Sequence, residues 1–360
     1  MPRKELAVDN VAEAYLALLA ERGVEYLFAN AGTDFAPLVE AFAKAARTGV
    51  PVPQPVLATH ENLAFSMAHG YAMVTRRVPA VMVHVSVGTA NGICGALNAA
   101  RENVPILFTA GRSPLTESGL PGARDVYIHW AQEMFDQAGM LREIVKWDYE
   151  LRNGEQLETV IDRALSVATT PPGGPVYLSL PREVLAAPLP DFSYDSPARR
   201  LAAAPPGPDK GAIEEAARLL AAAENPLIVT ASAGRDPAAV DALADFARRF
   251  AIPVVQHRPR HLCLPADHPC HLGYDAAPYL DAADAILVLE CDVPWIPSLE
   301  APRPECRVIH LGVDPLFSRY PIRGFPCDLA VTGAPAAAVP ELAEAVAPVT
   351  ARSQGKPRIG

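Results

Sequence analysis

Residues 80–112, AVMVHVSVGTANGICGALNAARENVPILFTAGR, are the stretch that decides the fold class. Residues 80–85 and 106–110 are short, nearly continuous apolar runs, a pattern typical of strands that are buried on both faces. Residues 91–101 between them have the apolar spacing of a helix. A strand, a helix and a second strand in this order predict two parallel strands joined by a helical crossover.

The same alternation extends through the first half of the chain. Because each apolar run is strand-length and each intervening segment has helical spacing, we expect one mainly parallel sheet covered by helices on both faces. Further strands are expected at residues 26–29, 55–59 and 174–180, and further helices at residues 11–22, 35–46 and 61–74.

A proline-rich segment, residues 186–209, interrupts this pattern with six prolines and little periodicity. Beyond it, helices are expected at residues 213–223, 238–250 and 340–346, with Pro340 in a first helical turn, and strands at residues 227–231, 253–256, 285–289 and 307–311. The sequence therefore predicts an α/β protein of two three-layer α/β/α domains with mainly parallel sheets. These are residues 1–185 and a Rossmann-like domain at residues 210–347, with a linker at 186–209 and a polar, frayed tail at 348–360.

Composition excludes several classes of function. Half of the 360 residues are hydrophobic, so the chain can bury real cores and is not of the disordered class. The 31 Lys and Arg residues against 41 Asp and Glu residues give a net charge of −10, which makes nucleic acid or an anionic membrane an unexpected partner. We find no secretory signal and no apolar run of membrane-spanning length, and therefore expect a cytoplasmic protein with reduced cysteines.

Polar residues follow four of the predicted strands in the first domain. Because open parallel sheets bind ligands beyond the carboxyl ends of their strands, these residues are candidates for one site. Each also has a structural explanation: Glu61 could stabilise a helix start, His84 could be a buried core histidine, and Thr33 or Ser86 could be helix caps. The polar groups are residues 30–34, His60 with Glu61, His84 with a loop at residues 86–91, and residues 111–113.

No sequence motif marks a nucleotide or metal site. The chain contains neither G-x-G-x-x-G nor G-x-x-x-x-G-K-[ST], and no G-x-S-x-G nucleophile motif. Histidines and cysteines are frequent between His257 and His271, but their spacing fits no standard zinc site. We therefore predict no metal ligands in this chain.

Several ordered segments resemble the family of thiamine-diphosphate-dependent decarboxylases and acetolactate-synthase-like enzymes. The segment THENLAFSMAHGYA is similar to the family's activating-glutamate segment, and His84 in VMVHVSVGTAN is more similar to benzoylformate decarboxylase than to acetolactate synthase. The resemblance covers nearly the whole chain. It extends to GVEYLFANAGTDFAPLVEAF, SVGTANGICGALNAARENVPILFTAGR, VKWDYE and GPVYLSLPREV in the first half, and to NPLIVTASAG and DHPCHLGY in the second.

The resemblance implies thiamine diphosphate as the cofactor and a 2-keto acid as the substrate. It implies that Glu61 activates the cofactor through its aminopyrimidine ring, and that His84 and Thr33 act on the substrate in proton transfer and carboxylate orientation. The acid would lose CO₂ to give an aldehyde or a carboligation product. The resemblance further implies cofactor contacts from Glu61, Asn30, Gly32, Thr89, Asn91 and, through a looser match, Gln132.

The resemblance also implies that this chain carries half of a site. In the family, Mg²⁺ and the cofactor's diphosphate are bound by a G-D-G…N segment in a third domain, and this sequence contains no Gly-Asp-Gly. We therefore expect a diphosphate-binding domain either further along a longer chain or as a separate chain, in a homodimer or tetramer. Two alternatives stay open: an acetolactate-synthase-like enzyme, and a catalytically silent subunit or fragment with a structural or ligand-binding role.

Relatives in this family carry FAD or ADP in the central domain. The candidate for phosphate contacts here is the loop at residues 232–236, but its sequence is a weak match to any phosphate loop. We therefore expect an inert structural domain rather than a nucleotide site.

Overall fold

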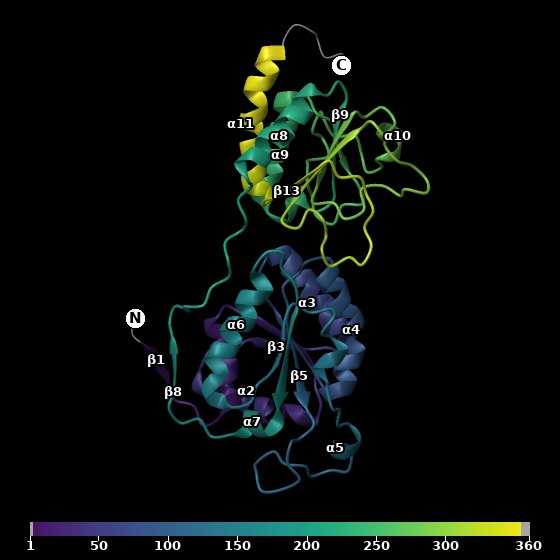
Figure 1. Ribbon diagram of the computed structural model, residues 1–360. Coiled ribbons are helices and arrows are strands. Elements are labelled where there is room, and N and C mark those ends of the chain that lie inside the picture. The colour runs from purple at the N-terminus through teal and green to yellow at the C-terminus, as the bar shows by residue number, and fades with distance from the viewer. Residues whose placement is uncertain (1–2, 354–360) are drawn as a thin grey trace. The chain divides into compact units, whose positions relative to one another are not determined.

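The chain folds into two compact units, Met1–Ala204 (unit 1) and Pro205–Gly360 (unit 2). The computed structural model describes residues 3–353. Each unit is built around its own mainly parallel sheet with helices packed against it, which confirms the predicted α/β class (Figure 1). The boundary between the units falls inside the proline-rich segment 186–209.

Unit 1 contains a six-stranded sheet in the order β3-β2-β4-β5-β7-β6, and every neighbouring pair is parallel. The central strands are apolar and buried on both faces, as a parallel sheet between helix layers requires. The strands are β2 (Tyr26–Asn30), β3 (Gln54–Leu57), β4 (Ala80–Val83), β5 (Leu107–Arg112), β6 (Asp148–Glu150) and β7 (Val176–Pro181).

Helices cover both faces of this sheet. Successive residues of β4 alternate between two cores: Met82 packs with α1 (Val11–Glu21), α2 (Ala36–Thr48) and α6 (Leu157–Thr169), whereas Val83 packs with the helices on the other face. These are α3 (Glu61–Thr75) and α4 (Val85–Arg101). The remaining short elements are η1 (Thr33–Phe35), α5 (Ile128–Ala131), η2 (Ala138–Met140), η3 (Gly154–Gln156) and α7 (Arg182–Ala186).

Helix α4 begins at Val85, six residues earlier than the sequence predicts, so the expected loop at residues 86–91 is helical. Serine, threonine and glycine in its first turns lower helix propensity, but burial overrides that preference. Its glycines allow α4 to pack closely on α3, because a Cβ on Gly95 would collide with Phe65.

The predicted linker is partly folded. Strand β8 (Phe192–Asp195) pairs antiparallel with β1 (Arg3–Leu6), and both Phe192 and Tyr194 are buried against unit 1. Strand β6 and helix α6 are also absent from the sequence prediction. Strand β1 is charged, so its pairing with β8 has no signal in the hydrophobic pattern.

Unit 2 has a five-stranded parallel sheet in the order β10-β9-β11-β12-β13. Helices α8, α9 and α11 pack together against one face of it, and the short α10 belongs to the core on the other face. The strands are β9 (Pro226–Thr230), β10 (Val254–Gln256), β11 (Ala285–Leu289), β12 (Arg307–Gly312) and β13 (Leu329–Thr332); the helices are α8 (Lys210–Ala222), η4 (Ala233–Arg235), α9 (Pro237–Phe250), α10 (Ala277–Leu280) and α11 (Pro335–Ser353).

The last helix corrects the sequence prediction. α11 begins at Pro335 rather than at Pro340 and continues to Ser353, into the segment predicted as tail. Pro335 therefore takes the first helical position, where a missing N–H costs nothing, and Pro340 lies within the helix. Strand β13 is also absent from the sequence prediction. Residues 354–360 of the predicted tail lie outside the described residues.

None of the helices between residues 3 and 353 combines the length and the apolarity needed to cross a membrane.

Candidate functional site

The predicted site lies at the carboxyl edge of the sheet of unit 1, and His84 is at its centre. His84 follows β4 and precedes α4. Its Nδ1 lies 2.6 Å from Oδ1 of Asp34, in the segment after β2, and its Nε2 lies 3.0 Å from Nε2 of Gln132, which ends α5. The edge therefore brings together three segments that are far apart in the sequence.

Asp34 belongs to the polar segment 30–34 that was predicted to contribute to the site, but it was not singled out as a site residue. Only 2% of its surface is exposed, and its second carboxylate oxygen accepts a hydrogen bond from the backbone N–H of Val85 at 3.3 Å. The available signal was an acidic residue in a polar loop after a buried strand. It gave no reason to prefer Asp34 to the neighbouring Thr33.

Two glycines leave the space that this pair occupies. A Cβ on Gly32 would collide with the His84 ring, and a Cβ on Gly111, in β5, would collide with the Asp34 carboxylate. Gly32 was predicted to contact the cofactor; in this structure its lack of a side chain admits His84.

Gln132, the loosest match in the sequence analysis, lies directly against His84. Its backbone carbonyl accepts a hydrogen bond from Ser86 Oγ at 3.0 Å, which fixes this end of α5 near the start of α4. The side-chain oxygen Oε1 of Gln132 is buried and has no hydrogen-bond partner within the described chain. A hydrogen-bond donor of a ligand would satisfy it.

Thr33 lies beside a second histidine that the sequence analysis missed. Thr33 Oγ1 is 3.4 Å from Nε2 of His129, which is buried. Burial, and then the nearby Arg182 guanidinium, lower the pKa of His129 below its ordinary value. This shift favours the neutral ring, which can share one hydrogen with Thr33.

Glu61 and Asn91 form a separate pair. Glu61 is the first residue of α3, 6% exposed, and its Oε2 accepts a hydrogen bond from Asn91 Nδ2 at 3.2 Å. Over residues 3–353 its other oxygen, Oε1, makes no hydrogen bond. No hydrogen bond or ion pair of the described residues connects this pair to His84. A buried carboxyl group at a helix start, with one oxygen anchored and one available, can accept a hydrogen bond from a ring N–H or, when it is protonated, donate one to a ring nitrogen.

The other two predicted cofactor contacts have partners inside the protein. Asn30 Nδ2 donates to the carbonyl of Ala58 at 2.9 Å. Thr89 is fully buried, and its hydroxyl group lies 2.8 Å from both the Val85 carbonyl and the Tyr177 hydroxyl. Contacts of Asn30 and Thr89 with a cofactor stay predictions.

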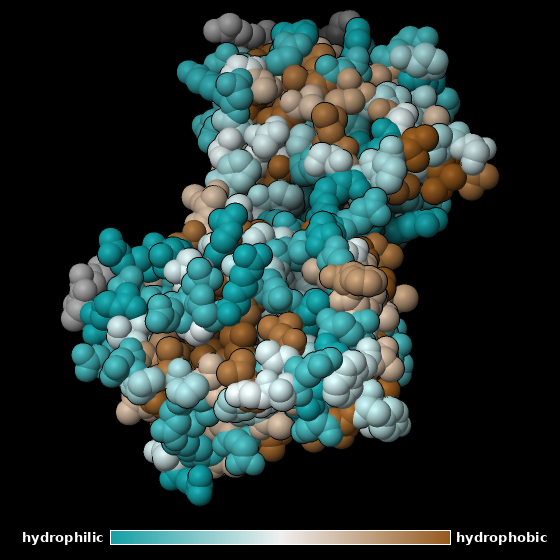
Figure 2. All heavy atoms as spheres, turned by 60° about the horizontal axis from the view of Figure 1, so that its bottom comes forward, coloured by the Kyte–Doolittle hydropathy of each residue, from teal (hydrophilic) through white to brown (hydrophobic). Residues whose placement is uncertain are grey.

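Apolar side chains are exposed at the same edge of unit 1. Figure 2 turns this edge toward the viewer and shows hydrophobic side chains at the surface among polar ones. Large exposed apolar surface commonly marks an interaction face. In the segment between β5 and β6 the exposed apolar residues are Leu115, Leu120, Val126, Tyr127, Trp130 and Phe135.

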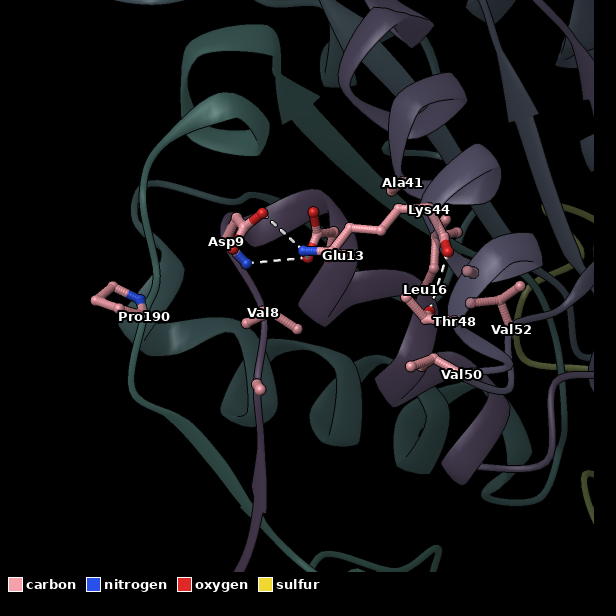
Figure 3. A pocket seen from close by; sticks show the side chains of 12 residues that line it. Val8, Asp9, Glu13, Leu16, Ala41, Lys44, Thr48, Val50, Val52 and Pro190 are labelled. Carbon is pink, nitrogen blue, oxygen red and sulfur yellow. Dashed lines mark hydrogen bonds and ion pairs between the residues drawn. The ribbon is translucent and has the colours of Figure 1, made fainter.

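A pocket of about 430 Å³ lies elsewhere on unit 1, between α1, α2 and the segment that leads to β3 (Figure 3). Lys44 lies over it, with Nζ at 2.7 Å from both Asp9 Oδ2 and Glu13 Oε2. None of the predicted site residues lines this pocket, and its one lysine already has two carboxylate partners. We do not assign it to the site.

The carboxyl edge of the sheet of unit 2 is closed by its own side chains. Arg260 makes two hydrogen bonds to Asp292, at 3.0 and 2.8 Å, and its backbone N–H donates to the carbonyl of Ala231. A Cβ on Gly234, in the predicted phosphate loop, would collide with the carbonyl of Leu262. No group of three His, Cys, Asp or Glu side chains within residues 3–353 could hold a metal ion. An inert structural role for this unit stays our prediction.

Two family models match the chain. The model described as "Thiamine pyrophosphate enzyme, N-terminal TPP binding domain" matches residues 9–140, and the model described as "Thiamine pyrophosphate enzyme, central domain" matches residues 213–342. The first match lies in unit 1 and includes Thr33, Glu61 and His84. The second lies in unit 2.

Individual relatives agree with these models. The chain is 27% identical over 316 residues to the acetolactate synthase large subunit of Haemophilus influenzae, which covers 84% of this chain and 52% of the relative. It is 28% identical over 296 residues to the benzoylformate decarboxylase of Pseudomonas aeruginosa, covering 79% and 52%. The chain thus spans about half the length of the curated relatives it matches.

Solved structures share the fold. A putative thiamin diphosphate-dependent enzyme from Mycobacterium smegmatis superposes with a TM-score of 0.77 at 24% identity, over 96% of this chain and 63% of that chain. Benzoylformate decarboxylase from Polynucleobacter necessarius gives 0.76 at 23% identity, over 94% and 61%.

Proposed function

Because the chain belongs to the thiamine pyrophosphate enzyme family, we propose that it provides the pyrimidine-binding half of an active site that removes CO₂ from a 2-keto acid. The product is an aldehyde if the remaining fragment takes up a proton, and a carboligation product if it joins a second carbonyl compound. Mg²⁺ and the cofactor's diphosphate are held by a further domain, in cis or on a separate chain.

The pair Glu61–Asn91 carries this proposal. When bound, thiamine diphosphate supplies the electron sink that a 2-keto acid needs to release CO₂. The residues present fit its aminopyrimidine end: Glu61 is nearly buried, Asn91 holds one carboxylate oxygen, and the other oxygen has no partner in the described chain. Glu61 would hold the pyrimidine ring nitrogen and exchange a proton with it.

His84 and Thr33 are proposed to act on the substrate side. His84 Nε2 faces the side-chain amide of Gln132, so it can take up a proton and then return it once a substrate displaces that amide. Thr33 offers a hydroxyl group to a substrate carboxylate, with His129 next to it.

We further propose that copies of this chain assemble as a homodimer or tetramer. Exposed apolar residues on α3 and α4 support this, because such helix faces are common in subunit interfaces. They are Leu63, Met67 and Val74 on α3 and Val87 and Leu97 on α4.

An acetolactate-synthase-like carboligase is the second candidate, favoured by the match to the Haemophilus influenzae enzyme. Product analysis separates the two reactions, since a decarboxylase releases the aldehyde and a carboligase releases the coupled product. The third candidate is a catalytically silent subunit, and the buried carboxylate of Glu61 argues against it.

The test uses Glu61→Gln in the enzyme completed with its diphosphate-binding domain. The amide is nearly isosteric with the carboxyl group but cannot exchange a proton with the ring, so decarboxylation and exchange of the cofactor's C2 hydrogen should both slow by at least about a hundredfold. Glu40→Gln, on the exposed face of α2, is the matched control. Wild-type exchange in Glu61→Gln would contradict the proposal.

A further inference from the structure

We propose that Asp34 is a positioning residue that keeps His84 in one orientation and one tautomer, with the proton on Nδ1 and a bare Nε2 at the site. The assignment of the tautomer stands on the geometry of this chain alone. Its consequence for catalysis rests on the proposed function.

Hydrogen-bonding roles fix the tautomer. A carboxylate only accepts, so the 2.6 Å contact between Asp34 Oδ1 and His84 Nδ1 requires a hydrogen on Nδ1. In a neutral ring Nε2 then has no hydrogen and accepts. Gln132 presents its amide Nε2, a donor, to this atom at 3.0 Å. The contacts of both ring nitrogens therefore require the same tautomer, with the hydrogen on Nδ1.

Packing fixes the orientation. Asp34 is 2% exposed, and its other oxygen accepts from the N–H of Val85 at 3.3 Å, so the carboxylate is bound at both oxygens. Gly32 lies against the ring and Gly111 against the carboxylate, too close for a Cβ at either position. The contact of Nδ1 with Asp34 and the close approach of Gly32 together hold the His84 ring in this orientation.

This arrangement suits a residue that moves protons at Nε2. When Nε2 takes up a proton, the ring becomes a cation, and the adjacent carboxylate of Asp34 stabilises it. Asp34 does not touch the reacting atoms and acts through His84.

A purely structural role for Asp34 would be to hold the start of α4 through the N–H of Val85. The variant Asp34→Asn separates the two roles. The amide oxygen of Asn can still accept from Val85, but its NH₂ group then faces His84 Nδ1 and requires that nitrogen to be an acceptor. The proton would move to Nε2, opposite the NH₂ group of Gln132.

The test is ¹⁵N NMR of the full chain labelled at its histidines, with the His84 signals assigned from their loss in His84→Gln. Wild type should show a protonated Nδ1 and a bare Nε2. Asp34→Asn should reverse the two nitrogens, while the melting temperature changes little. A bare Nδ1 in wild type, or an unchanged tautomer in Asp34→Asn, would overturn the proposal. The wild-type spectrum tests it even if this variant does not fold.

A second variant perturbs the pair and keeps both side chains. Gly111→Ala should displace Asp34 and alter the Nδ1 signal of His84. Its matched control is Gly70→Ala in α3, where a Cβ meets no atom within 4 Å and the signal should stay as in wild type. An unaltered Nδ1 signal in Gly111→Ala would count against the proposed packing.

Activity separates this inference from the proposed function. In the enzyme completed with its diphosphate-binding domain, Asp34→Asn should lower kcat by about a hundredfold or more with a small change in KM. Full activity in Asp34→Asn would overturn the catalytic consequence and leave the function standing. A completed wild-type enzyme that shows the expected tautomer but no decarboxylation would have the opposite meaning: the tautomer assignment would stand and the proposed function would fail.

Discussion

Each unit has a histidine in, or directly after, a central strand of its sheet, and the two histidines have opposite neighbours. In unit 1, His84 faces the carboxylate of Asp34. In unit 2, His310 lies within β12, 1% exposed, with Nδ1 at 3.2 Å from the Arg323 guanidinium and Nε2 at 2.9 Å from the Pro326 carbonyl. A carboxylate supports a positive ring and a guanidinium opposes one, so similar sheets give these histidines different chemistry.

The pKa of His310 is lowered by these surroundings. Burial, and then the charge of Arg323, lower it to about 4. The Pro326 carbonyl accepts a hydrogen from Nε2, and Arg323 donates to Nδ1, so the neutral ring satisfies both partners. His310 is a structural residue, and protonation would set a new N–H against Arg323.

The largest effects are expected when each histidine is replaced by alanine. His84→Ala should slow turnover of the completed enzyme by roughly a hundredfold or more with a small change in melting temperature, because a proton-transfer group is lost. His310→Ala should lower the melting temperature through a cavity and unpaired polar groups, and leave the activity of each folded molecule unchanged. Thermal unfolding and activity assays measure both. If His84→Ala loses mainly stability, His84 is a core residue like His310.

A pH dependence of the stability of unit 2 is the next largest effect. Between pH 6.5 and about 4 the unfolded chain binds a proton at His310 that the folded unit excludes. Stability is therefore present above pH 6.5 and is lost as the pH falls toward 4, by about 3 kcal/mol for this residue. The lowered pKa of His257 acts in the same direction.

Urea unfolding at several pH values measures this loss. Trp295 is buried in unit 2, so replacing Trp130 and Trp147 by Phe makes tryptophan fluorescence report on that unit. In this background, the free energy of unfolding of unit 2 should depend less on pH in His310→Gln than in the protein that keeps His310. Equal slopes with and without His310 would show that Arg323 does not hold the ring neutral.

Gly70→Ala should have a smaller effect on the free energy of unfolding. Gly70 lies in α3 with open space where a Cβ would be, so alanine should stabilise unit 1 by about 0.5–1 kcal/mol through lower backbone entropy in the unfolded chain. Unit 2 should be unaffected. Thermal unfolding of the chain measures it, and destabilisation would show that this face of α3 is not open.

Sequence patterns predicted the alternating elements well because buried parallel strands are short apolar runs. They failed where polar or small residues are buried. The first turns of α4 look like a loop until their packing on β4 and α3 is known, and charged β1 is a strand only because β8 lies beside it.

The site was predicted from strand ends and from resemblance, which found His84, Glu61 and Asn91 but did not single out Asp34 or His129. Asp34 and His129 had the same signal as many polar loop residues. Their contacts depend on distances between β2, β4 and α5 that no local pattern encodes. Gln132, by contrast, was a loose match that the structure places directly on His84.

The smallest effect we predict is that of magnesium on cofactor binding by this chain alone. Glu61 and its neighbours offer a contact to the aminopyrimidine, which is a small area with which to offset the entropy of binding. The described residues provide no cluster of ligands for a metal ion, so Mg²⁺ has nothing on which to bridge the diphosphate. Calorimetry of residues 1–360 should therefore show weak binding of thiamine diphosphate that hardly changes when Mg²⁺ is added, and no turnover of a 2-keto acid. Addition of the diphosphate-binding domain should make binding both tight and magnesium-dependent. Micromolar, magnesium-dependent binding by the chain alone would mean that unit 1 holds the charged end of the cofactor, and that the carboxyl edge around His84 and Glu61 serves a different half of the site.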